Sequence, residues 1–449
     1  MARSRPDATA HHGAVPAPTV DSPPVSSTRT ADGAPGPASP AVDRHLPALD
    51  GWRAVAALAV LVNHVGVLSG LNGRSPELGQ FIARADVGVS IFFVLSGFLL
   101  YRPFVTARLA GEPHGDLSAY ARRRLLRIFP AYWVALFLVA FVLRAPPFEE
   151  PHSIVAHALL LQVYDGEQVV GGPIQQSWTL ATEVAFYAFL PCYAWLLARR
   201  RRAADRQLRV EVAGVAALWL GSMLLKTVAL ASGMGAARFG QVNTWLPFRL
   251  DEFALGMGLA VAVAWWNHRG RVQPAWLRGA GATAACWAVA ALLFWITCTR
   301  LGLPLSPILS GRQAFVMRAM YSLVAIFLVA PAVLAARPGQ PARVLLANRV
   351  AVWLGLISYG IYLWHEAFQD LYLRWTDRPA LQAPFLGMLV WTLAFSVLAG
   401  AASWYLVERP AMGWGRRTVA RERQDPDLDP PADGRSVAQE PAAADRPPG

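Results

Sequence analysis

One histidine lies inside the first long apolar run of the chain, LDGWRAVAALAVLVNHV, and an arginine precedes it by eleven residues. Because eleven residues make almost three helical turns, one continuous helix would place Arg53 and His64 on the same face, about 16 Å apart along its axis. Ionisable groups at the depth of a bilayer are costly, and they persist mainly where they line a polar cavity or take part in chemistry. The pair therefore predicts a buried imidazole that can take up a proton or attack an electrophile. The alternative is a histidine hydrogen-bonded between packed helices, with the arginine anchoring the helix end.

Glu183, in QSWTLATEVAFYAFLP, is the only acidic residue well inside an apolar run that has no basic neighbour on its own helix. On a helix that enters the membrane near Ser177 it would lie roughly 9 Å deep, so its partner must come from another helix. We expect its carboxylate to hydrogen-bond a substrate hydroxyl or to hold an imidazolium. The alternative is a structural ion pair with an arginine of another span.

Three arginines precede the third apolar run, in the segment YARRRLLRIFPAYW. Arg124 and Arg127 are three residues apart and therefore share a helical face, and Arg123 lies beside them. Guanidinium groups make forked hydrogen bonds to phosphate, so the segment predicts a site for a phosphate-bearing ligand. The same residues would also suit a membrane anchor on the cytoplasmic side or a contact with lipid headgroups.

Two further groups of polar and aromatic residues lie near the ends of later apolar runs. They are Arg249, Asp251 and Glu252 in FRLDEFALGMGLA, and Tyr362, Trp364, His365 and Glu366 in ISYGIYLWHEAF. We expect both groups to line a mouth through which a polar substrate enters. Aromatic and charged residues also populate ordinary membrane interfaces, and that alternative applies to each residue taken singly.

Composition restricts the class of protein. Hydrophobic residues make up 55% of the 449 residues and charged residues 16%, so most of the chain must face lipid. The formal net charge of +12 would suit nucleic acid, but the arginines cluster between apolar runs, which membrane topology explains better. The cysteines have no paired spacing, so we expect neither a disulfide nor a zinc site, and we predict no metal.

Ten apolar runs are long enough to cross a bilayer. They begin near residues 47, 86, 129, 177, 210, 246, 276, 315, 350 and 384. The sequence thus predicts an all-α fold, a polytopic membrane bundle of about ten transmembrane helices in residues 45–412. Residues 1–44 and 413–449 have the composition of disordered tails. The stretch from Ser153 to Val163 is too short to cross and is predicted to lie at the interface or to re-enter.

The distribution of arginines sets the orientation of the spans. Six lie between the second and third spans and six between the fourth and fifth, whereas the alternate connections hold fewer. They are Arg102, Arg108, Arg122, Arg123, Arg124 and Arg127, and then Arg199 to Arg202, Arg206 and Arg209. We expect these loops and, with ten spans, both termini to be cytoplasmic. Arg53 would then lie at the cytoplasmic mouth of the first span, with Asp251 and His365 toward the outer face.

Six segments resemble, in order and spacing, those of the acyltransferase 3 family of multipass membrane acyltransferases. They are LDGWRAVAALAVLVNH, FFVLSGFLL, RRRLLRIFPAYW, SWTLATEVAFYAFLP, FRLDEFALGMGLA and ISYGIYLWH, within residues 46 to 410. The resemblance implies transfer of an acyl group, commonly acetyl from acetyl-CoA, to a hydroxyl of a sugar-containing acceptor such as an envelope polysaccharide or a macrolide.

The resemblance also implies roles for single residues. We expect catalysis from Arg53, His64 and Glu183, with the histidine as general base or transient acyl carrier. The resemblance also supports Arg124 and Arg127 as acyl-CoA contacts, and we add Arg123 because it lies beside them. The acceptor contacts are predicted from the two polar groups described above, and they are Arg249, Asp251, Tyr362, Trp364 and His365. Acyl-CoA is expected as a co-substrate with no bound cofactor, in a multipass protein of the plasma membrane that binds no nucleic acid.

A multipass transporter of a small polar or amphipathic molecule is the leading alternative, because polar residues within many spans also mark translocation routes. The sequence shows no obvious internal repeat and no pair of broken helices in matching halves, which argues against a transporter. A membrane scaffold with lipid-binding arginine loops is the third possibility, and it would not depend on His64.

Overall fold

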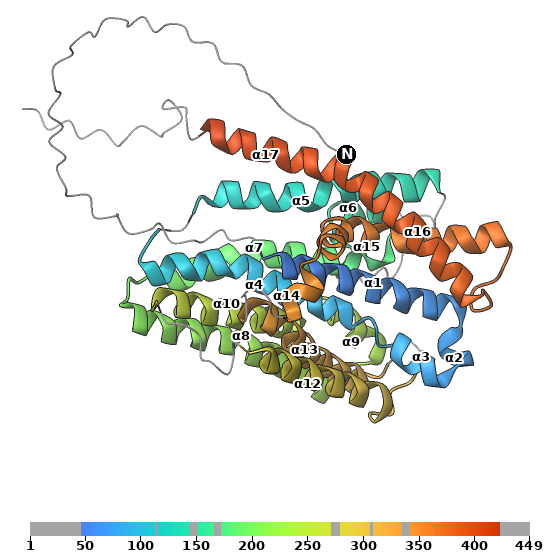
Figure 1. Ribbon diagram of the computed structural model, residues 1–449, viewed down its shortest axis with the longest axis horizontal. Coiled ribbons are helices and arrows are strands. Elements are labelled where there is room, and N and C mark those ends of the chain that lie inside the picture. The colour runs from blue at the N-terminus through green and yellow to red at the C-terminus, as the bar shows by residue number, and fades with distance from the viewer. Residues whose placement is uncertain are drawn as a thin grey trace, which may run out of the picture. The chain divides into compact units, whose positions relative to one another are not determined.

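The computed structural model describes residues 46–113, 115–143, 151–165, 172–270, 279–305, 309–334 and 341–422, and these contain helices and turns but no strand (Figure 1). Each of the ten predicted spans falls on one long helix. These helices are α1 (Pro47–Ser69), α4 (Val87–Ala110), α5 (Leu117–Phe137), α7 (Trp178–Ala198), α8 (Ala204–Ala231), α10 (Leu250–His268), α12 (Ala280–Thr299), α13 (Gly311–Leu334), α15 (Arg349–Thr376) and α16 (Phe385–Ser403). The prediction of an all-α polytopic bundle is confirmed.

Eight helical segments are long and apolar enough to cross a membrane by length and composition. The helices α10 and α15 are not among them, because they carry ionisable residues such as Asp251, Glu252 and Glu366. Both pack inside the bundle, α10 against α4 and α15 against α1. A helix that is surrounded by other helices can carry polar groups that a lipid-facing helix cannot. The chain is a multipass membrane protein.

Short helical segments connect the spans. They are α2 (Leu71–Arg74) and α3 (Pro76–Ile82), α6 (Pro151–Ala158), η2 (Gln162–Tyr164) and η3 (Gln175–Ser177), α9 (Ala236–Val242) and η4 (Leu246–Phe248), and α14 (Pro341–Leu346). The stretch from Ser153 to Val163 falls on α6 and η2, and neither is long enough to cross a bilayer.

The third predicted span begins earlier than its apolar run. Helix α5 starts at Leu117, and the carboxylate of Asp116 accepts a hydrogen bond from the backbone N–H of Ser118 at 2.8 Å. The arginines at 122–124 and 127 therefore lie on α5 itself, and their assignment to the loop between the second and third spans was wrong. Arginine has a high helix propensity, so a basic stretch indicates where the helix leaves the apolar part of the membrane and not where the helix ends. Arg108 is likewise part of α4, where its side chain is buried and its Nε lies 2.6 Å from Oε1 of Glu211.

Helix α16 continues past the predicted end of the membrane domain. A π-helical turn, η5 (Trp404–Glu408), joins it to α17 (Arg409–Glu422), so the predicted boundary at residue 412 falls inside a helix. Figure 1 shows α17 running along α5. The two helices approach closely at Gly415, where a Cβ would lie 2.5 Å from Leu126. The predicted tail 1–44 and the residues from 423 onward lie outside the described residues.

Glycines allow the helices that carry the polar residues to pack closely. A Cβ on Gly97 would collide with the carbonyl oxygen of Phe253 on α10, and one on Gly88 with that of Ala56 on α1. On α15, a Cβ on Gly355 would collide with the carbonyl oxygen of Asp50 on α1. This last contact brings α1 and α15 into register.

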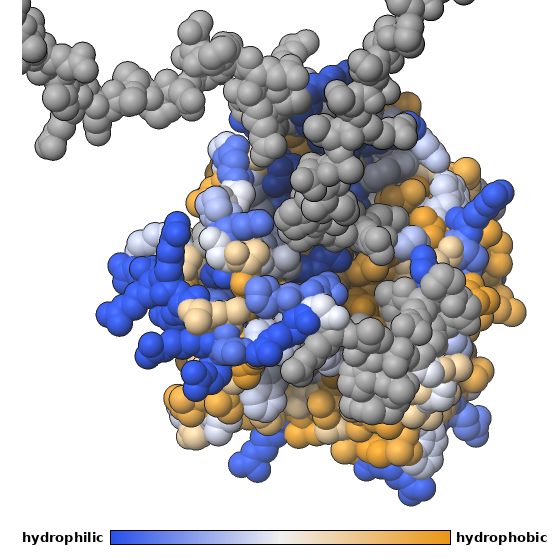
Figure 2. Space-filling model, turned by 60° about the vertical axis from the view of Figure 1, so that its left-hand side comes forward, coloured by the Kyte–Doolittle hydropathy of each residue, from blue (hydrophilic) through white to orange (hydrophobic). Residues whose placement is uncertain are grey.

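The ends at which α4 and α7 finish and α5 and α8 begin carry six exposed arginines, and we call this side of the bundle the basic end. Figure 2 brings it forward and shows strongly hydrophilic side chains gathered there, with hydrophobic side chains on the flanks. The exposed arginines include Arg123, Arg199, Arg200, Arg201, Arg206 and Arg209.

Candidate active site

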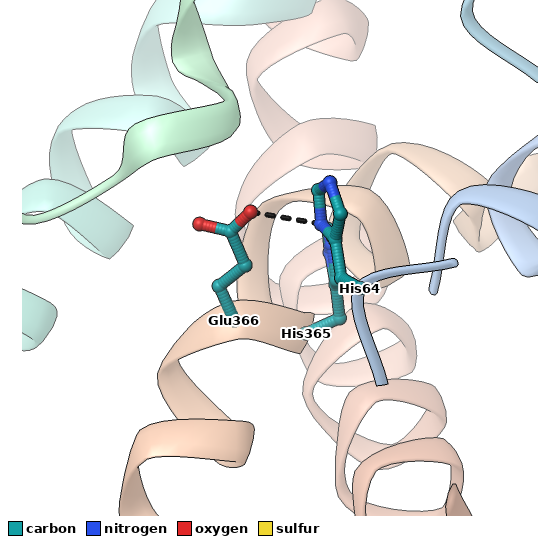
Figure 3. A group of neighbouring side chains, drawn as sticks. All are labelled: His64, His365 and Glu366. Atoms are coloured by element: carbon teal, nitrogen blue, oxygen red, sulfur yellow. Dashed lines mark hydrogen bonds and ion pairs between the residues drawn. The ribbon is translucent and has the colours of Figure 1, made fainter. Parts of the chain in front are cut away.

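His64, near the end of α1, faces two consecutive residues of α15 (Figure 3). Its Nδ1 lies 2.8 Å from Nε2 of His365 and 2.8 Å from Oε1 of Glu366. His365 is fully buried, whereas the side chains of His64 and Glu366 are 28% and 23% exposed. Two imidazoles and one carboxylate therefore meet at a point that solvent or substrate can reach.

The two imidazoles are hydrogen-bonded head on. Their planes are inclined by only 18° and their centroids are 5.0 Å apart. This separation equals the 2.8 Å between the two nitrogens plus about two ring radii, so the rings lie edge to edge and not face to face. A linear N–H···N bond needs this geometry, because the proton of an imidazole points outward in the ring plane.

The partners of His365 determine where the protons lie. Its Nδ1 is 2.7 Å from the backbone carbonyl oxygen of Tyr362, which can only accept a hydrogen bond. In the neutral ring Nδ1 must then carry the proton and Nε2 must accept, so Nδ1 of His64 is the donor to it. Nε2 of His64 is left with its lone pair and makes no hydrogen bond within the described residues.

The same three side chains are also a possible metal-binding group, since their ligand atoms all lie within 4.8 Å of one another. Two nitrogens on one tetrahedral zinc, each about 2.0 to 2.1 Å from it, would be roughly 3.4 Å apart. The histidine nitrogens are closer than this, at 2.8 Å, and their lone-pair axes point at each other. The arrangement is therefore that of a hydrogen-bonded triad.

Glu183 does not make the predicted contact with His64. Its Oε1 accepts hydrogen bonds from the hydroxyls of Ser96 on α4 and Tyr187 on α7, each at 2.8 Å. Glu366 occupies the place beside the imidazole that was predicted for Glu183. The sequence names both acids, but it does not show which helix adjoins α1, and it is α15 that does so.

Glu183 and Arg53 instead line one cavity between α1, α4, α7 and α15. Its walls are formed by Arg53, Val89, Phe92, Phe93, Leu95, Ser96, Leu99, Thr179, Leu180, Glu183, Tyr359 and Tyr362. Nε of Arg53 is buried and has no hydrogen-bond partner among the described residues. We call this space the Arg53 cavity; His64 lies on the same helix as Arg53 but is not among its lining residues.

Tyr362 connects the Arg53 cavity to the histidines. Its ring lines the cavity, its hydroxyl is 2.9 Å from that of Thr179, and its backbone carbonyl holds His365. Trp364, predicted to contact the acceptor with it, is 9% exposed and stacks on Phe368 with centroids 6.1 Å apart. The structure thus places Tyr362 and His365 in the site and gives Trp364 a packing partner on its own helix.

The predicted phosphate-binding arginines differ in their surroundings. Arg127 pairs with the buried Glu408 at 3.0 Å, so its charge is already balanced within the protein. Arg124 lies over the ring of Tyr120, 5.8 Å from its centroid, and its Nε has no hydrogen-bond partner among the described residues. Arg123 is exposed at the basic end. Arg124 is therefore better placed than Arg127 to meet a ligand phosphate.

Arg249 and Asp251 do not form the open mouth that the sequence predicted. Arg249 is 1% exposed; its Nε donates to the carbonyl oxygen of Asn243 at 2.6 Å and its Nη1 lies 3.2 Å from Glu252. Asp251 is fully buried, 2.7 Å from Nζ of Lys226. These charges lie near the start of a helix, where a sequence suggests exposure, but α10 is enclosed by its neighbours.

Comparison with known proteins agrees with this architecture. A family model described as an acyltransferase domain, that of the acyltransferase 3 family, matches residues 46–408. The chain is 25% identical over 392 residues to peptidoglycan O-acetyltransferase OatA of Listeria monocytogenes, covering 82% of the chain and 56% of OatA. It is 25% identical over 398 residues to the putative peptidoglycan O-acetyltransferase YrhL of Bacillus subtilis, covering 84% and 56%.

A third relative has nearly the same length as the aligned region. The chain is 27% identical over 416 residues to acyltransferase MdmB of Streptomyces mycarofaciens, covering 86% of the chain and 96% of MdmB. The chain spans only about half the length of the two peptidoglycan O-acetyltransferases, 56% in each case. No solved structure matches the chain.

Proposed function

Because this chain belongs to the acyltransferase 3 family, we propose that it transfers an acyl group, in the first place acetyl, from acyl-CoA to a hydroxyl of a sugar-containing acceptor. The observation that carries the proposal is the imidazole of His64, whose Nε2 is free while its Nδ1 is held by His365 and Glu366. The names of the relatives support O-acyl transfer, since two are called peptidoglycan O-acetyltransferases and the third an acyltransferase.

In the proposed reaction His64 acts as general base. Its Nε2 takes the proton of the acceptor hydroxyl as the oxygen attacks the thioester carbonyl, and the carbon–sulfur bond then breaks. The departing thiolate takes the proton from the imidazolium, so the products are the ester and free CoA. The carboxylate of Glu366, 2.8 Å from Nδ1, offsets the positive charge that the ring carries in between.

Attack by Nε2 on the thioester itself is the second route that the geometry allows. The acyl group would then pass through an acyl-imidazole before it reaches the acceptor. Rapid denaturation at neutral pH of the enzyme with radiolabelled acetyl-CoA and no acceptor separates the two routes, because only the second leaves label on the protein.

The Arg53 cavity is the proposed site of the acyl-pantetheine arm. It combines aromatic walls with a guanidinium whose Nε has no partner among the described residues, and it lies between the basic end and the histidines. Arg123 and Arg124 would bind the phosphates of CoA at that end. We place the basic end in the cytoplasm, where CoA is found, together with the residues that precede α1 and follow α17, and we place the protein in the plasma membrane.

The test is acyl transfer by the purified full chain in lipid nanodiscs. Radiolabelled acetyl-CoA is supplied with N-acetylglucosamine, methyl α-glucopyranoside or muropeptides, and transfer to the sugar and release of CoA are measured. The variant His64→Gln is compared with His152→Gln, a matched change at a histidine whose side chain is 65% exposed. Loss of general-base catalysis should lower the rate by about 100- to 10,000-fold. Transfer by His64→Gln at the wild-type rate would refute the proposal, and sugar uptake into vesicles without use of acetyl-CoA would indicate the transporter instead.

A further inference from the structure

Three helices form a closed ring of polar contacts beside the catalytic triad. On α4, Ser90 donates to Oε1 of Glu252 at 2.9 Å, and Glu252 follows Asp251 on α10. Asp251 accepts from Ser322 of α13 at 3.3 Å, and one turn away on α13 Arg318 lies 3.4 Å from Asp86. Asp86 directly precedes α4 and is one turn from Ser90, so these contacts connect α4, α10 and α13 and lead back to α4. We call this set the polar ring.

Two atoms of the polar ring are buried without a hydrogen-bond partner among the described residues: Nη1 of Arg318 and Oε2 of Glu252. Native proteins satisfy nearly all buried polar atoms, so an unsatisfied pair needs an explanation. One of these atoms can only donate and the other, as a carboxylate oxygen, can only accept. A hydroxyl group does both, so a ligand with neighbouring hydroxyls would satisfy the two together.

The polar ring opens beside the part of α1 that leads to the imidazole of His64. The side chain of Glu252 is fully buried, but those of Arg318 and Asp86 are 13% and 21% exposed, so the ring is accessible on their side. Asn63, next to His64, donates to the carbonyl oxygen of Ile82 at 3.1 Å, and Gly88 packs on α1 at Ala56. Asp86 lies between these two contacts along the chain, so it borders the stretch of α1 between Ala56 and Asn63, which ends next to His64.

From these observations we infer that the polar ring binds the hydroxyls of a sugar, with Arg318 and Asp86 at its entrance. The inference rests on the proposed function in that the bound sugar is the acyl acceptor. Helices α4 and α13 both begin on the side away from the basic end, so the sugar enters opposite to CoA. Tyr321 orients Asp86 through a hydrogen bond of 2.6 Å to its Oδ1, which leaves Oδ2 for Arg318 and the ligand.

The test measures sugar binding without catalysis, by heat unfolding of the full chain in nanodiscs. A ligand that binds only the folded protein raises its unfolding temperature, and the rise grows with the ratio of ligand concentration to Kd. Methyl α-glucopyranoside and N-acetylglucosamine are the probes, and their deoxy analogues are the negative controls. At least one probe should stabilise the wild type. The variants Arg318→Lys, which keeps the charge, and Asp86→Asn, which keeps the shape, should weaken its apparent affinity about tenfold to a hundredfold, as expected for the loss of a hydrogen bond to a charged group.

A matched pair of variants provides the control. Arg269 and Asp205 form an exposed ion pair at the basic end, so Arg269→Lys and Asp205→Asn make the same chemical changes away from the polar ring. These two should respond to the sugar as the wild type does. The inference is overturned if neither probe stabilises the wild type, or if the variants of Arg318 and Asp86 respond fully. His64→Gln separates this result from the proposed function, because it should lose acyl transfer and keep the response to sugar.

Discussion

Replacing Glu366 by glutamine isolates the part of catalysis that depends on the carboxylate beside His64. Its Oε1 lies 2.8 Å from Nδ1 of the imidazole. At an effective dielectric constant of about 20, two unit charges at that distance attract by roughly 6 kcal/mol. This is a ceiling, because the side chains of His64 and Glu366 are 28% and 23% exposed and solvent screens them. A hydrogen bond to a charged group contributes about 1.5 to 3 kcal/mol, so we expect kcat to fall about 10- to 150-fold.

The pattern of the change matters as much as its size. The imidazolium exists only on the way to the products, so Glu366→Gln should lower kcat and kcat/KM equally and leave both KM values unchanged. His365 still accepts from Nδ1 of His64, and the tautomer is therefore retained in the variant. Initial rates with radiolabelled acetyl-CoA measure these constants, with Glu77→Gln on exposed α3 as the matched control. A kcat within twofold of the wild type, or a raised KM alone, would refute the assignment of Glu366.

Two further predictions concern the arginines of α5. Arg124→Gln should raise the apparent KM for acetyl-CoA about tenfold and leave that for the sugar unchanged, as titration of each substrate would show; an unchanged donor KM would exclude Arg124 from the CoA site. Arg127→Gln should destabilise the fold by about 3 to 5 kcal/mol, because it leaves Glu408 buried without its cation. Adding Glu408→Gln should restore most of the unfolding temperature in detergent, and a single variant as stable as the wild type would contradict the ion-pair role.

The positions of the spans follow from the sequence because a bilayer imposes one simple requirement on them. Each span needs a long run of apolar residues, and all ten predicted runs fall on long helices. The ends of the helices were less predictable. Helix α5 extends through its arginines to Leu117 and α17 extends to Glu422, since a basic segment continues a helix wherever a neighbouring helix supports it.

The interior of the bundle was harder to predict, because packing decides whether a charge is exposed. Arg249 and Asp251 begin α10, and the start of an apolar run suggests a mouth open to solvent. In the structure α4, α8 and α13 enclose them. Asp251 pairs with Lys226, which is distant in sequence, and Arg249 pairs with Glu252, three residues further along the same helix. Hydropathy along one helix carries no information about which other helices surround it.

The pairing of the His64 imidazole shows the same limit most sharply. Position on α1 identifies His64, since an ionisable residue deep in a span needs a polar partner. Glu183 was predicted for that part because it has no basic neighbour on its own helix, whereas Glu366 was grouped with the residues of an outer mouth. Glu183 instead accepts from two hydroxyls, Ser96 and Tyr187, which a sequence cannot rank as partners. The signal that could have identified the partners is that His365 and Glu366 are consecutive in the sequence. Because α15 runs alongside α1, both side chains reach Nδ1 of His64, and the carboxylate of Glu366 supplies the negative charge.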